Sequence, residues 1–190
     1  AEHVTTIQSG HRDTSQGAAT PRGGSEWATS ENPAAPHPRR CGNATTAALP
    51  SRPVTDGILV YQQIQQLIAR GALAASPAIA PTQIQPSSLD LRLAARGHRV
   101  RSGFLPENVR VADRLEEMTL YTFDLSDGAV LEKGHCYIIP LLERIAEPLP
   151  HLIRANPKSS TGRLDLFTRL LADRCGRFET VPPGYTGPLY

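Results

Sequence analysis

The 190-residue sequence carries 20 Lys and Arg against 18 Asp and Glu, a net charge of +2, and 39% of its residues are hydrophobic. A nearly neutral chain with dispersed basic residues is a poor candidate for a nucleic-acid-binding protein. No stretch reaches the roughly 20 apolar residues that span a bilayer, so we expect no membrane partner. Cys41, Cys136 and Cys175 lie far apart without a Cys-x-x-Cys pair, which fits reduced thiols in a cytoplasmic protein.

Residues 1–52 form a segment with almost no large apolar side chains. Ser, Thr, Gly, Pro, Ala and Arg dominate it, and the exceptions are Val4, Ile7, Trp27 and Leu49. Burial of so few apolar groups does not offset the entropy of ordering the backbone. We therefore predict a disordered or non-native tail at 1–55 and an ordered domain at 56–190.

The first predicted element is a short amphipathic helix over Tyr61 to Arg70. Its apolar residues fall at helical spacing, and Gly71 is a suitable stop. The next segment, 72–83, contains Pro77 and Pro81 and is predicted to be irregular and extended. These two elements lead into the more regular part of the sequence.

The rest of the sequence is predicted to consist of strands and turns. Asp127-Gly128 is the strongest hairpin signal. The stretch 164–171 fits strand alternation at first and helical spacing later, and we assign a strand. The candidate strands are Leu89 to Leu93, Met118 to Leu125, Val130-Leu131, Cys136 to Leu142 and Leu164 to Ala172. Many short strands separated by Pro and Gly corners predict an all-β sandwich or barrel rather than a parallel α/β sheet.

The segment from Asn156 to Arg163 concentrates two cations, three hydroxyls and a glycine in one turn. Lys158 and Arg163 supply positive charge, and Ser-Ser-Thr can begin a helix whose N-terminus favours anions. Such chemistry suits a phosphate tail. The same composition is also typical of a solvated loop, so the segment alone leaves both interpretations open.

Two further segments bear on that choice. Gln85 to Leu93 (Gln-Pro-Ser-Ser-Leu-Asp-Leu-Arg-Leu) begins with a turn signal and then alternates, as a strand does. Val181 to Tyr190 is a Pro- and Gly-rich corner with Tyr185 at its tip. In this order, the three segments resemble the dCTP deaminase branch of the dUTPase-like superfamily, and most closely the first domain of tandem-domain bacterial members. The resemblance covers roughly Gly57 to the end.

The resemblance implies a distorted β-barrel or jelly-roll-like fold of the dUTPase type, with one short N-terminal helix. It also implies a homotrimer, or a pseudo-trimer built from tandem domains, with active sites shared between subunits. dCTP or dUTP would be the nucleotide ligand, with Mg²⁺ accompanying its triphosphate. Zinc is not expected, because no histidine begins a His-x-Glu motif and Pro-Cys-x-x-Cys is absent.

Carried over by position, the resemblance places Lys158 on phosphate, Ser159 near the attacking water, and Arg163 near the base and the catalytic centre. The substrate-binding set is Lys158, Ser159, Ser160, Thr161, Gly162, Arg163, Tyr185 and Tyr190. Asp90 is the carboxylate of the first motif, which in the family organises the fold or the water shell of the metal. The alternative for Asp90 is a strand-edge carboxylate paired with a nearby arginine.

The family's catalytic glutamate follows the Pro-Gly-aromatic corner by a few residues, and this sequence stops at Tyr190. Glu179 is the only carboxylate near the corner, but it precedes the motif and is a poor substitute base. We therefore expect the 190-residue fragment alone to be inactive. For the parent protein we expect zinc-independent deamination of dCTP to dUTP. The alternatives are dUTP diphosphatase activity, alone or in addition, and a non-catalytic nucleotide-binding domain of a tandem protein.

Overall fold

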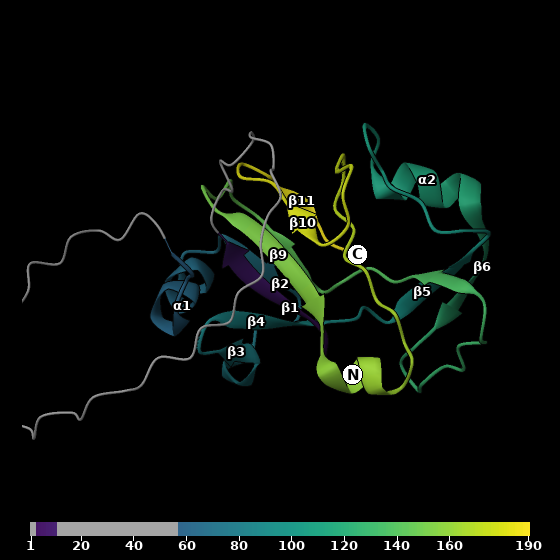
Figure 1. Ribbon diagram of the computed structural model, residues 1–190, viewed down its shortest axis with the longest axis horizontal. Coiled ribbons are helices and arrows are strands. Elements are labelled where there is room, and N and C mark those ends of the chain that lie inside the picture. The colour runs from purple at the N-terminus through teal and green to yellow at the C-terminus, as the bar shows by residue number, and fades with distance from the viewer. Residues whose placement is uncertain (1–2, 11–56) are drawn as a thin grey trace, which may run out of the picture. The chain divides into compact units, whose positions relative to one another are not determined.

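The structure is a computed structural model, and it describes residues 3–10 and 57–190 (Figure 1). Its largest sheet has five strands in the order β10-β9-β1-β4-β3, all neighbours being antiparallel. The bounds of these strands are β1 His3–Gly10, β3 Ile84–Gln85, β4 Ser88–Arg92, β9 Leu152–Pro157 and β10 Thr180–Val181. Strand β1 occupies the centre of this sheet. It lies between β4, which contains Asp90, and β9, which ends directly before Lys158.

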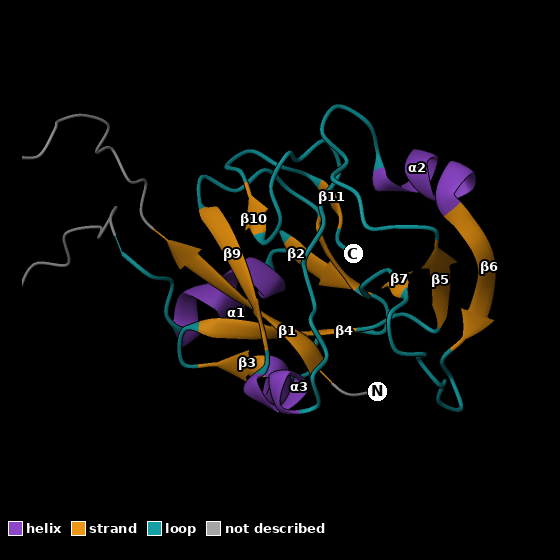
Figure 2. Cartoon of the chain, turned by 45° about the vertical axis from the view of Figure 1, so that its right-hand side comes forward, coloured by secondary structure: helices purple, strands orange, loops and turns teal. Residues whose placement is uncertain are grey.

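Two smaller antiparallel sheets complete the β structure. One has the order β11-β8-β2 and the other β6-β5-β7. Their strands are β2 Leu73–Ala75, β5 Arg96–Val100, β6 Thr119–Asp124, β7 Cys136–Ile138, β8 Glu143–Ile145 and β11 Gly187–Pro188. The described residues are mostly strands with few helices, which confirms the predicted mostly-β fold, and the sheets that they form have open strand orders (Figure 2).

The helices are short. They are α1 Tyr61–Ala69, the 3₁₀ helix η1 Pro81–Gln83, α2 Val111–Met118 and α3 Ser159–Arg163. Helix α1 begins where predicted and buries Ile64 and Leu67, which lie on one face at a spacing of three residues. Within the described ranges, no helix has the length and apolar character needed to cross a bilayer.

The apolar core consists of two clusters. The larger joins α1 to strands β4, β8 and β9 through Leu67, Leu89, Leu91, Ile145 and Ile153. The smaller packs α2 on the β5 and β7 sheet, around Val100, Val111, Leu115, Ile138 and Leu171. Leu89 and Leu91 face the larger cluster, and alternation along β4 turns Asp90 to the other face of the strand. The hydrophobic contacts of β4 thus determine the direction of the Asp90 side chain.

Several sequence-based predictions are confirmed. Strands β4 and β6 coincide with the predicted strands 89–93 and 118–125, and β7 forms the first half of the predicted strand 136–142. Asp127-Gly128 lies in a turn, with Gly128 at φ +89°, but this turn does not close a two-residue hairpin. Instead, β6 and β7 both pair with β5, one on each side.

Other predictions are wrong. No strand forms at 130–131, where Val130 is 91% exposed and has no sheet to cover. The stretch 164–172 is irregular apart from one bridge between Ala172 and Leu189. Its first apolar residues are exposed, Leu164 by 68% and Phe167 by 91%, so apolar alternation there does not reflect burial in a sheet. The part of the chain that the structure describes also forms three α-helices rather than the single helix expected.

The N-terminal prediction differs from the structure in one respect. His3–Gly10 forms β1 and pairs with β4 and β9, although 1–55 was predicted to be a disordered or non-native tail. Residues 11–55 of that prediction lie outside the described residues. A strand here was not expected because His3–Gly10 has only two large apolar residues, yet hydrogen bonding on both edges can stabilise a strand of weak propensity.

Candidate functional site

The predicted phosphate segment lies at the end of β9. The strand ends at Pro157, Lys158 has extended backbone dihedrals (φ −62°, ψ 145°), and α3 begins at Ser159. Ser159, Ser160, Gly162 and Arg163 are exposed, whereas Thr161 is only 9% exposed and turns inward. Five of the six predicted loop residues are therefore accessible at least in part, and Thr161 serves to anchor the short helix.

Lys158 forms an ion pair with the first-motif carboxylate. Its Nζ lies 2.7 Å from Oδ2 of Asp90, whose side chain is 3% exposed, while the Lys158 side chain is 34% exposed. Gln85 Nε2 also donates to Asp90 Oδ2, at 3.3 Å. Two motifs separated by almost 70 residues thus meet at one buried carboxylate. The cation that pairs with Asp90 here is Lys158, whereas the alternative considered from the sequence was a nearby arginine.

The Lys158 ammonium can serve two anions at once. It has three N–H donors, one of which is directed at Asp90, and a third of its side chain faces solvent next to the exposed hydroxyls of α3. Arg163, at the other end of the helix, is exposed and has no ion-pair partner within 3–10 and 57–190. The segment therefore presents two cations and two serine hydroxyls to a ligand.

The predicted C-terminal corner is built around Tyr185. Its hydroxyl donates to the Pro188 carbonyl at 2.6 Å and accepts from the Asp173 backbone N–H at 3.2 Å. Burial raises the pKa of Tyr185, and burial with the nearby Asp173 carboxylate raises the pKa of Tyr190. Both phenols therefore remain protonated at neutral pH, so neither acts as a base.

The phosphate segment and the corner lie at opposite ends of β9. Val181 pairs with Ile153, and Gly184 N–H donates to the Leu149 carbonyl, so the corner continues past the start of the strand. Lys158 follows the other end, five residues beyond Ile153, or about 16 Å at the rise of a β-strand. One chain therefore brings Asp90 to the Lys158 segment and leaves Tyr185 apart from it. Figure 2 shows α3 beside β3, away from β11.

Glu179 is not placed to act as a base at this segment. Its carboxylate is paired with the Arg169 guanidinium, and its backbone carbonyl accepts from the Ala155 N–H. The sequence-based judgement of Glu179 as a poor substitute is consistent with this pairing.

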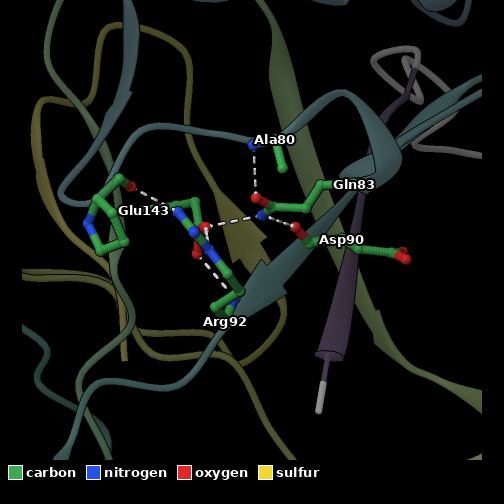
Figure 3. A network of polar contacts seen from close by, with 6 residues as sticks. Ala80, Gln83, Asp90, Arg92 and Glu143 are labelled. Carbon is green, nitrogen blue, oxygen red and sulfur yellow. Dashed lines mark hydrogen bonds and ion pairs between the residues drawn. The ribbon is translucent and has the colours of Figure 1, made fainter. Parts of the chain in front are cut away.

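Next to Asp90 lies a buried polar network that no sequence motif indicated (Figure 3). Gln83 is 1% exposed and Glu143 is 3% exposed, and the two side chains are joined by a hydrogen bond of 2.9 Å. Glu143 also forms an ion pair with Arg92 at 2.8 Å. The only signal in the sequence is a Gln and a Glu within apolar surroundings, which does not reveal that they meet across 60 residues.

Replacement of Gly187 by alanine is expected to lower the free energy of unfolding by about 2 kcal/mol. Gly187 has φ +151°, and an added Cβ would come 2.6 Å from the Tyr185 hydroxyl oxygen. Tyr185 would have to leave its two hydrogen bonds. Urea denaturation of the full-length protein, followed by circular dichroism, measures the loss.

Gly184→Ala is the matched control in the same corner. Gly184 has φ +81°, but a Cβ there meets nothing within 4 Å. Only the backbone strain of about 1 kcal/mol is expected. Equal losses for the two variants would show that the corner does not depend on the Tyr185 hydrogen bonds.

Comparison with known proteins finds one family whose model matches residues 55–190, described as the 2'-deoxycytidine 5'-triphosphate deaminase (DCD) N-terminal domain. A curated relative, "dCTP deaminase, dUMP-forming" from Corynebacterium kroppenstedtii, is 33% identical over 131 residues. That alignment covers 68% of this chain and 66% of the relative. Residues 55–190, which the family model matches, contain every residue of the candidate site.

A solved structure is also similar. The crystal structure of 2'-deoxycytidine 5'-triphosphate deaminase from Agrobacterium tumefaciens superposes with a TM-score of 0.67 at 48% sequence identity. The match covers 70% of this chain and 40% of the solved chain. This chain therefore spans about two fifths of that relative's length and just under two thirds of the curated one.

Proposed function

The chain belongs to the 2'-deoxycytidine 5'-triphosphate deaminase (DCD) N-terminal domain family, and from this premise we propose that the protein containing it hydrolyses dCTP to dUTP and ammonia. The observation that carries the proposal is the contact between Lys158 and the buried Asp90. This contact holds a segment rich in cations and hydroxyls in one place, next to two exposed serines. A triphosphate requires such a preorganised set of donors.

In the proposed reaction, water adds to C4 of the cytosine ring, and the bond from C4 to the exocyclic nitrogen breaks to release ammonia. Lys158 binds phosphate oxygens, Ser159 orients the attacking water, and Arg163 stabilises charge near the base. The proton from the water passes to a glutamate supplied from outside the 190 residues, and then to the leaving nitrogen. No step requires zinc.

The separation of the two halves of the site supports a shared active centre. Because Tyr185 lies beyond one end of β9 and Lys158 beyond the other, one copy of the domain does not enclose a nucleotide between them. A corner from a second domain would complete the pocket. We accordingly propose a trimer, or a pseudo-trimer of tandem domains, in which the β-sheets close into the barrel that the family resemblance implies.

The substrate is proposed to be the Mg²⁺ complex of dCTP. Magnesium prefers phosphate oxygens and water and usually needs few protein ligands. Asp90 is the nearest carboxylate of the site, and its Oδ2 is already bound by Lys158 and Gln85. Its suitable role is therefore to position Lys158, and to contact the metal at most through water.

A second candidate function is the formation of dUMP, in which diphosphate is released as well. The printed name of the Corynebacterium kroppenstedtii relative includes this product. The reaction would require a second water to attack the α-phosphate after deamination. Lys158 and Arg163 could bind the triphosphate in either reaction. Only the products, dUTP or dUMP with diphosphate, therefore distinguish the two candidate functions.

The test is to incubate the full-length protein with dCTP or dUTP and Mg²⁺ and to separate the products. Ammonia with dUTP is the expected result. Ammonia with dUMP and diphosphate would favour the second candidate, and diphosphate from dUTP without any ammonia from dCTP would contradict deamination. Chelation of Mg²⁺ is expected to slow either reaction, and added zinc is not expected to replace it.

A further inference from the structure

The polar network beside Asp90 binds the backbone of the strand that carries it. Gln83 Nε2 donates to the Asp90 carbonyl at 2.8 Å and to Glu143 Oε1 at 2.9 Å. Gln83 Oε1 accepts from the Ala80 N–H at 2.9 Å. Each polar group of the buried Gln83 side chain thus has a hydrogen-bond partner. The two bonds made by its Nε2 connect Glu143 to Asp90.

Glu143 contacts the same strand two residues further on. Its Oε2 accepts from the Arg92 backbone N–H, and its Oε1 accepts from Arg92 Nε, both at 2.8 Å. Arg92 in turn donates to the Pro77 carbonyl at 2.8 Å. Figure 3 shows Gln83 and Glu143 on one side of the strand, directed at Asp90 and Arg92. The two side chains therefore act as a pair along one edge of β4.

On this edge of β4, Gln83 and Glu143 bond to the backbone beyond the residues that pair with β3. Strand β3 pairs only with Ser88 and Leu89, and on the other edge β1 runs along the strand to Arg92. Unpaired backbone groups at a buried edge are costly, so they need other partners. The side chains of Gln83 and Glu143 supply those hydrogen bonds. These bonds fix the position of the Asp90 backbone in the sheet.

The consequence reaches Lys158 because the Asp90 carboxylate is the anchor of that ammonium, at 2.7 Å. A hydrogen bond of this length tolerates only a small displacement before it weakens. If Asp90 loses the donor on its carbonyl, its carboxylate moves with the backbone and Lys158 follows. The path is continuous from Glu143 through Gln83 and Asp90 to Lys158.

We propose that Gln83 and Glu143 are positioning residues of the nucleotide site, which hold Asp90 so that Lys158 points at the triphosphate. The proposal rests on the proposed function for its kinetic readout. It assigns to a buried Gln and Glu a role in binding, although neither is exposed enough to touch a ligand. Glu143 begins β8 and pairs there with Ala75 of β2, so its backbone is held in a sheet of its own.

The main variant is Gln83→Met in the full-length protein, which keeps the length of the side chain and removes its hydrogen bonds. The KM for dCTP is expected to rise about tenfold, because a factor of this size corresponds to the loss of one to two good hydrogen bonds. The kcat is expected to change less than about threefold. The exposed Gln65, which bonds only to the Tyr61 hydroxyl, provides the matched control. Gln65→Met is expected to leave both constants unchanged.

A second pair of variants separates positioning from stability. Gln83→Glu places two buried carboxylates together and is expected to lower the Tm. Adding Glu143→Gln restores a donor between the two positions, so the Tm should recover. The Asp90 carbonyl still lacks a donor in this double variant, so the KM should stay high. If Gln83→Met does not fold, this pair provides the test.

A readout that needs no nucleotide is the reactivity of Lys158 toward an amine-acylating reagent, measured by mass spectrometry relative to Lys133. It should rise in Gln83→Met, because an ammonium released from the Asp90 carboxylate is more accessible to the reagent. The proposal is overturned if folded Gln83→Met matches the wild type in KM and in labelling, or if KM and Tm recover together in the double variant. A wild-type protein that releases no ammonia from dCTP would contradict the proposed function. The labelling of Lys158 does not depend on turnover, so it would still test whether Gln83 positions Asp90 and Lys158.

Discussion

Replacing Lys158 with methionine is expected to lower the free energy of unfolding by about 2 kcal/mol, below the 3–5 kcal/mol typical of a fully buried pair because Lys158 is partly exposed. The reason is that Asp90 remains as a buried charge without its cation, at 3% side-chain exposure. Denaturation by urea, followed by circular dichroism on the full-length protein, gives the value. Gln85 remains as a donor to Asp90 and limits the loss.

Two further variants make this prediction specific. Asp90→Asn combined with Lys158→Met removes both charges and should recover at least half of the lost stability, because no uncompensated carboxylate remains. Lys133, the other lysine of the sequence, is exposed, and Lys133→Met should be neutral. If Lys158→Met costs no more than Lys133→Met, the Asp90–Lys158 pair does not hold the segment in place.

The second large effect concerns turnover. Arg163→Ala and Ser159→Ala are each expected to lower kcat/KM for dCTP by at least about 100-fold, because each removes a group proposed to act on the transition state. Both side chains are exposed at α3 and Arg163 has no ion-pair partner in the described part of the chain, so folding should be little affected. Steady-state ammonia release from the full-length protein measures the change.

Arg101→Ala and Ser102→Ala are suitable controls, since both residues are exposed and lie in the loop after β5. Neither should alter kcat/KM. Undiminished turnover in Arg163→Ala and Ser159→Ala would mean that another domain carries the reaction. In that case this domain would be a structural or regulatory partner that retains a nucleotide-binding segment.

Local patterns in the sequence predicted those elements whose side chains face a core. Alternation located β4, and helical spacing located α1, because their apolar residues are arranged toward a partner. The same patterns failed where the partner is absent. The segment after α3 alternates like a strand, yet Phe167 and Leu164 are exposed and pair with no sheet in the described residues.

Helix α2 was not predicted, although its sequence has the apolar spacing of an amphipathic helix. Val111, Leu115 and Met118 follow the spacing of one helical face, and Val111 and Leu115 are buried. Strand β1 carried no comparable signal. Its position depends on pairing with both β4 and β9, which are far from it in sequence. Long-range pairing of this kind is not encoded in the local pattern.

Only part of the candidate site was predicted, because contacts between distant residues are not encoded in local sequence patterns. The motifs indicated Lys158 and Asp90 separately, and the ion pair between them emerged only from the fold. Gln83 and Glu143 belong to no motif, because their partners are backbone groups and each other. Sequence can identify groups that meet a ligand by their chemistry, whereas the groups that hold them in place require the topology.

The most direct measurement of the central claim is calorimetric titration of dCTP with Mg²⁺ into the full-length protein and into its Asp90→Asn/Lys158→Met variant. The Lys158 segment is predicted to bind the triphosphate, so the wild-type protein should give saturable binding and the variant should lose at least about tenfold in affinity. A wild-type protein that gives no binding heat, or a variant that binds dCTP as tightly as the wild type, would contradict the assignment of this segment as the nucleotide site.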